Sequence, residues 1–159
     1  MRFLLLKKNN FFIIINLLLT IFLFTSCDSG DPVEPQENHF EAIGTVVYDA
    51  TGAVAASILR GVTNDTLYAP EGDLSDHFTV KFYDENEEII DPPVDEEDHY
   101  LGFEVGDAAV VATYQHPGEE GGYEFHLRGL KKGATTLELF IYHVDHKDYR
   151  SGNIPVVVK

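Results

Sequence analysis

The chain of 159 residues has no tryptophan, a single cysteine, and far fewer basic than acidic side chains. One cysteine cannot form a disulfide within the chain, so an apolar core must hold the fold together. Eleven Lys and Arg against 27 Asp and Glu give a formal net charge of −16. Phosphate recognition needs basic patches, so we expect no nucleic acid partner.

Long apolar runs are also missing. The longest, residues 11–24, is 14 residues long and is interrupted by Asn16. A helix that crosses a bilayer needs about 20 apolar residues. Three basic residues precede the run within the first eight positions, and Thr25 and Ser26 follow it. A basic start, a short apolar core and small residues predict a cleaved secretory signal.

The segment Phe24-Thr25-Ser26-Cys27 resembles the lipobox of bacterial lipoproteins. Phe24 departs from the leucine usual at that position. The resemblance implies a signal peptide over residues 1–26 and a lipidated Cys27 as the first mature residue. Each buried CH₂ contributes about 0.8 kcal/mol, so two or more acyl chains anchor a protein stably. We expect a lipid-anchored protein of the bacterial cell envelope, at the outer membrane or cell surface rather than the inner membrane.

The rest of the chain is expected to be a short tether and one all-β domain. Residues 27–38 are rich in Pro and acids and have no apolar periodicity, which predicts a flexible tether after the lipidated cysteine. Apolar residues then alternate with polar ones, and no helical stripe occurs. The expected strands are 40–48, 54–59, 65–68, 78–83, 101–105, 109–114, 123–128, 135–144 and 154–158. Such a series predicts a β-sandwich or barrel.

The C-terminal half resembles a known family. Residues 107–113 are followed by 125–137, with Gly129-Leu130-Lys131-Lys132-Gly133 at the centre, and by Ile154–Val158. This pattern is similar to bacterial Ig-like domains of the group found in adhesins. The resemblance implies an Ig-like β-sandwich over residues 39–159. It implies no activity, because the fold hosts many functions.

Seven histidines, which the Ig-like pattern does not require, lie between residues 39 and 146. Imidazole is the commonest protein ligand for zinc and copper. If residues 129–133 form a hairpin loop, the register places His116 opposite His146. Together with His143 and Asp145, these residues predict a zinc or copper site.

That site requires a turn at Val144–Asp145, because His143 and His146 would point to opposite faces of a regular strand. The alternative is that His143, which shares parity with Leu139 and Ile141, is a core residue at a strand end. The sequence leaves open whether His77 and His126 join a site.

Catalytic patterns are missing from the chain. Residues 84–98 contain nine acids without the spacing of an EF-hand, so we favour a solvated acidic loop over a calcium site. No GxSxG elbow is present. We therefore expect no enzyme, but a non-catalytic binding or structural module for an unidentified envelope or extracellular protein. The alternative is an envelope lipoprotein that binds zinc or copper.

Overall fold

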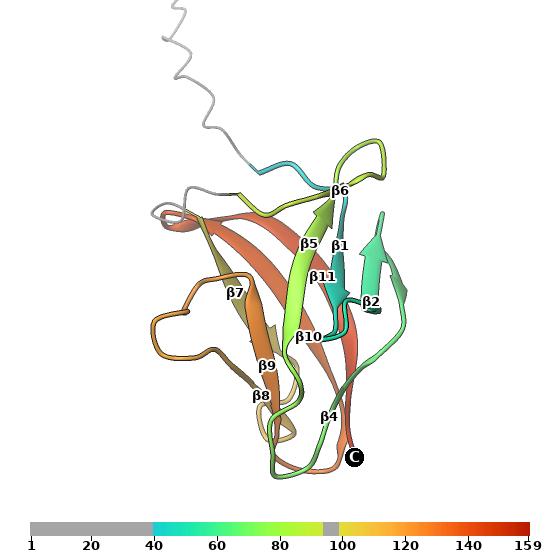
Figure 1. The fold of residues 1–159 in the computed structure, drawn as a ribbon, viewed down its shortest axis with the longest axis vertical. Coiled ribbons are helices and arrows are strands. Elements are labelled where there is room, and N and C mark those ends of the chain that lie inside the picture. Colours follow the sequence, from blue (N-terminus) through green and yellow to red (C-terminus); the bar gives the residue numbers. More distant parts are fainter. Residues whose placement is uncertain (1–39, 94–98) are drawn as a thin grey trace, which may run out of the picture. The chain divides into compact units, whose positions relative to one another are not determined.

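The computed structural model describes residues 40–93 and 99–159 (Figure 1). These belong to one compact unit, Asn38–Lys159. The expected signal peptide, Cys27 and the tether lie outside the described residues, as does His39. Within the described ranges, no helix has the length and apolar character to span a membrane.

The described residues form an all-β domain of two sheets. One has seven strands in the order β3-β2-β1-β5-β9-β8, with β6 paired to β5, and the other has the order β4-β11-β10-β7. All pairs are antiparallel except β4 with β11. The strands are β1 Gly44–Tyr48, β2 Val54–Leu59, β3 Val62–Asn64, β4 Leu67–Ala69, β5 Phe78–Tyr83, β6 Ile89–Ile90, β7 His99–Val105, β8 Val111–Tyr114, β9 Glu124–Gly129, β10 Gly133–His143 and β11 His146–Val158.

The core lies between the two sheets, which confirms the predicted β-sandwich. Strand β5 buries every second side chain, and β10 buries Leu137, Leu139 and Ile141 at the same spacing, with Phe140 buried as well. Phe103 of β7 contacts Phe125 of β9 at 5.1 Å between ring centroids, which joins the two sheets directly. The two apolar faces therefore cover each other, as a sandwich requires.

The predicted hairpin over residues 129–133 is wrong. Strand β9 lies in the seven-stranded sheet, whereas β10 pairs with β11 and β7 in the other. Both edges of β9 are already occupied, by β8 on one side and by β5 and residues 71–75 on the other. For example, the Ser75 N–H donates to the Leu127 carbonyl at 2.8 Å. The connection after Gly129 must therefore cross to the opposite sheet.

Strand β11 is much longer than predicted, because two irregularities break its alternation. It has 13 residues instead of the expected five, and curves with β10 as one long hairpin (Figure 1). The register with β10 shifts once near Ser151–Gly152 and again at Asp148, which is inserted between Lys147 and Tyr149. At the first shift, the Leu139 N–H donates to the Ser151 hydroxyl at 2.9 Å. Inserted residues of this kind re-aim side chains.

The core contribution of β10 can be tested with one pair of substitutions. Leu139 is fully buried and Leu130, in the crossing connection, is 47% exposed. We expect Leu139→Ala to lower the free energy of unfolding by about 2–5 kcal/mol, and Leu130→Ala to change it by less than about 0.5 kcal/mol. Urea unfolding in the presence of a chelator measures both. Equal losses would contradict the assignment of the core face.

Candidate metal site

Three histidines form a row across three neighbouring strands. In the register, His99 of β7 lies opposite His143 of β10, and His143 lies opposite His146 of β11. Opposite residues of antiparallel strands share one face, with Cβ atoms about 4.5–5.5 Å apart. The row occupies the core-facing side, because His143 continues the buried series of Leu139 and Ile141. It therefore lies at one end of the apolar core.

The β10–β11 hairpin brings His143 and His146 together through a turn at Val144–Asp145. The expected obstacle, that these histidines point to opposite faces, does not arise because they lie on different strands. Val144 has φ +54°, a backbone conformation that β-branched residues rarely adopt. Strained turns of this kind occur where the surrounding structure fixes the chain, often at functional sites.

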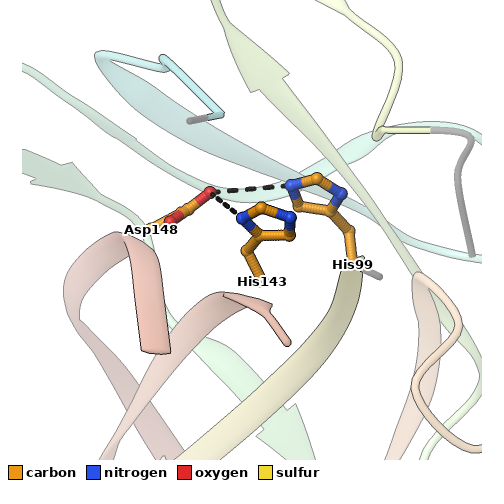
Figure 2. Close-up of side chains that lie close together, drawn as sticks. All are labelled: His99, His143 and Asp148. Carbon is orange, nitrogen blue, oxygen red and sulfur yellow. Dashed lines mark ion pairs between the residues drawn. The ribbon is translucent and has the colours of Figure 1, made fainter. Parts of the chain in front are cut away.

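A buried carboxylate faces all three rings. The Asp148 side chain is fully buried, and its Oδ1 lies 2.9 Å from His146 Nε2. Its Oδ2 lies 3.5 Å from His99 Nε2 and 3.8 Å from His143 Nδ1. Figure 2 shows the rings of His99 and His143 side by side, with dashed lines from the Asp148 carboxylate to each of them. We call His99, His143, His146 and Asp148 the buried His–Asp cluster.

The insertion in β11 explains why Asp148 points inward. Tyr149 is buried, so regular alternation would turn the preceding side chain to solvent. Because the register shifts at Asp148, both residues face the interior and Lys147 becomes exposed. Burial raises the pKa of Tyr149 to about 12. The neutral phenol shares a 2.6 Å hydrogen bond with the Thr45 hydroxyl, which ties the insertion to the other sheet.

The donor set suits a divalent transition metal. One ligand atom from each of His99, His143 and Asp148 lies within 4.8 Å of the others. Ligand atoms at 2.0–2.1 Å from a tetrahedral zinc ion are about 3.3 Å apart. The rings of His99 and His143 stack at 4.4 Å between centroids and 6° between planes. Since each lone pair lies in its ring plane, the two parallel rings must rotate relative to each other before both nitrogens can face one ion.

A cleft of about 410 Å³ borders the buried His–Asp cluster at His99. It is lined by His99, Tyr100 and residues 118–124. The latter segment is held against β7, because the Leu101 N–H donates to the Gly121 carbonyl at 2.7 Å. Glu119 and Glu120 are among the lining residues, so the approach to His99 carries negative charge that attracts cations.

The structure brings together only part of the set predicted from the sequence. His143 and His146 belong to the cluster, while Asp145 is exposed and lies 3.5 Å from His146 Nδ1, on the other side of that ring from Asp148. His116 lies elsewhere, with its Nε2 3.2 Å from His126 Nε2. The register that placed His116 opposite His146 is wrong because the hairpin at residues 129–133 does not form.

Sequence reasoning missed His99 and Asp148. His99 shares parity with the apolar residues Leu101 and Phe103, and this signal was available. Asp148 gave no such signal, because its inward direction depends on the register shift in β11.

Neither a family model nor a curated protein matches this chain. Among solved structures, domains 4 and 5 of the S-layer protein SbsC are similar, with a TM-score of 0.40 and 13% sequence identity. The match covers 60% of this chain and 47% of that one, so the chain spans about half the length of this neighbour. A similarity at this level assigns neither a family nor a function.

The strain at the turn predicts a stabilising substitution. Glycine adopts positive φ without steric cost, whereas another residue there costs roughly 1–2 kcal/mol. Val144 is 61% exposed, so its side chain contributes little packing. We expect Val144→Gly to raise the free energy of unfolding by about 1 kcal/mol. The control Val144→Ala keeps the Cβ and should give less than half of this gain. Urea unfolding in chelator measures both, and a loss of stability in Val144→Gly would rule out strain at this turn.

Proposed function

We propose that this chain is a lipid-anchored, non-catalytic β-sandwich of the bacterial cell envelope that binds a divalent transition metal, zinc or copper. The buried His–Asp cluster would hold the ion. The observation that carries the proposal is the fully buried Asp148 carboxylate with imidazole nitrogens of three strands directed at its two oxygens.

The distances support an ion better than a set of hydrogen bonds. His146 lies at hydrogen-bond distance from Asp148, at 2.9 Å. The contacts of His99 and His143 with the same carboxylate, at 3.5 and 3.8 Å, exceed the usual 2.7–3.2 Å of such bonds. They are close to the spacing of two ligands around one metal ion, about 3.3 Å.

The charges support the same conclusion. A buried carboxylate is costly unless it is compensated, and one protonated imidazole would neutralise it. Three imidazoles around Asp148 are more than charge balance requires. A cation that shares the carboxylate with several neutral imidazoles gives each of these rings a role.

The surroundings hold the ligands in place. All four cluster residues lie on the paired strands β7, β10 and β11, and the Phe40 N–H donates to Asp148 Oδ2 at 3.2 Å. Hydrogen bonds to ligating carboxylates orient them and tune the site. His99, His143 and Asp148 place one ligand atom each within 4.8 Å of one another, and His146 contacts the second carboxylate oxygen at 2.9 Å.

The metal site can be tested with one pair of matched substitutions. Asp148→Asn keeps the shape of the side chain and removes its charge, while Asp145→Asn makes the same change at an exposed position three residues away. We expect Asp148→Asn to weaken binding of Zn²⁺ or Cu²⁺ at least tenfold, and Asp145→Asn to change it less than twofold. Calorimetric titration of the purified protein measures both.

Bound metal should also stabilise the fold. A ligand at a hundred times its Kd contributes about 2.7 kcal/mol, so the melting temperature should rise in the wild type and in Asp145→Asn but not in Asp148→Asn. If both variants retain wild-type binding and stabilisation, the cluster is a purely structural network. The search would then turn to protein partners.

The anchor is tested separately. The resemblance to a lipobox implies that Cys27 carries the lipid, whereas the small residue at position 26 is needed only for cleavage of the signal peptide. In a bacterial host we expect Cys27→Ser to abolish incorporation of radiolabelled palmitate and to release the protein from the membrane fraction. Ser26→Ala should retain both. Labelling that persists in Cys27→Ser would contradict lipid anchoring at this residue.

A further inference from the structure

Three other histidines gather on the outer face of the seven-stranded sheet. The register pairs Phe78 of β5 with Phe125 of β9, which places the preceding His77 beside His126. Phe125 and Leu127 are buried, so His126 between them faces outward. His116 follows β8, whose last residue, Tyr114, is paired with His126. We call His77, His116 and His126 the outer histidine group.

Two of these imidazoles meet through their Nε2 atoms. His116 Nε2 and His126 Nε2 are 3.2 Å apart. The third ring, that of His77, is 5.9 Å from His126 between centroids, and its Nε2 lies 3.1 Å from Glu124 Oε2. The group borders a cleft of about 190 Å³, which Glu119 also lines. The Glu119 N–H donates to the His116 carbonyl at 2.9 Å, so this acid lies one turn from His116.

A backbone contact determines which nitrogen of His126 is free to bind. His126 Nδ1 lies 3.0 Å from the Ser75 carbonyl, which can only accept a hydrogen bond. Nδ1 therefore carries the proton and donates it, so Nε2 of the neutral ring presents a lone pair toward His116. Histidines that bind metals commonly donate their other N–H to a backbone carbonyl in this way.

We propose that His116 and His126 bind a second divalent transition-metal ion through their Nε2 atoms. Their 3.2 Å separation is close to the ~3.3 Å between two nitrogens of a tetrahedral zinc ion. His77 supports the site through Glu124 and is not required as a ligand. The preferred ions are Zn²⁺ and Cu²⁺, because imidazole suits both.

This second site is independent of the buried His–Asp cluster. It shares no ligand with that cluster and lies on the other sheet. His116 is exposed, whereas His99 is buried. The second site should therefore bind more weakly and exchange its ion faster than the buried one.

Metal stoichiometry tests the proposal. Full-length protein is dialysed to equilibrium against Zn²⁺, and in a parallel series Cu²⁺, and bound metal is quantified by mass spectrometry. His116→Gln removes one ligand at an exposed position where the fold does not depend on it. Arg128→Gln is the control, on the same outward face of β9 as His126. We expect two ions in the wild type and Arg128→Gln, one in His116→Gln or Asp148→Asn, and none in the double variant.

Nitrogen NMR supplies a second readout, because the metal-free contact is a hydrogen bond between the two rings. On addition of Zn²⁺, the Nε2 resonances of His116 and His126 should both shift to metal-bound values, whereas the His126 Nε2 resonance of the His116→Gln variant should not. Unchanged stoichiometry in His116→Gln, with unchanged Nε2 shifts in the wild type, would overturn the second site. If Asp148→Asn leaves the number of bound ions unchanged while His116→Gln lowers it, the proposed buried site is wrong and the proposed second site stands.

Discussion

The pairing of β10 with β11 is the interaction on which the rest of this domain depends. The two strands are 11 and 13 residues long and supply much of one wall of the core. Strand β7 adds to one side of this hairpin and β4 to the other, so the four-stranded sheet is built on it. The same strand pair, with its two register shifts, sets Leu137 opposite Ile154 in the core and His143 opposite His146. Core packing and the candidate metal site thus follow from one set of hydrogen bonds.

The two histidine groups occupy contrasting environments in one small domain. The buried His–Asp cluster lies on the inner face of its sheet, around a carboxylate that water does not reach. The outer histidine group lies on the solvent face of the other sheet, next to carboxylates that remain exposed. A low local dielectric strengthens interactions between an ion and its ligands but also raises the cost of an empty site. The buried environment favours retention of a bound ion, and the exposed environment favours its exchange.

The alternation of apolar residues was sufficient to predict the fold class and several strands, but not how they associate. Strand β5 and the core face of β10 could be read directly, because buried residues alternate along β5 and because Leu137, Leu139 and Ile141 of β10 keep the same period, although Phe140 is buried as well. The hairpin at residues 129–133 was predicted wrongly, because nothing local indicates that both edges of β9 are already taken. Strand pairing between segments far apart in sequence is a property of the assembled sheet.

The same limit applied to the candidate site. His143 and His146 were predicted because they are close in sequence, and His116 was added through a register that does not exist. Asp148 became visible only through the inserted residue in β11, and His99 only through its pairing with His143. The local sequence pattern therefore predicted His143 and His146 at the hairpin end of the site. The buried carboxylate of Asp148 and the third imidazole, that of His99, depend on how the strands pair.

The hydrogen bond from Phe40 to Asp148 has a mechanical consequence. Phe40 precedes β1, so a pull applied to the chain ahead of it reaches this bond before it reaches the strands. Phe40 also packs edge-on against Phe82, at 4.8 Å between centroids, so bond and ring would yield together. An ion that immobilises the Asp148 carboxylate would strengthen the point where the load enters, and the domain would resist extension more when loaded with metal than when empty.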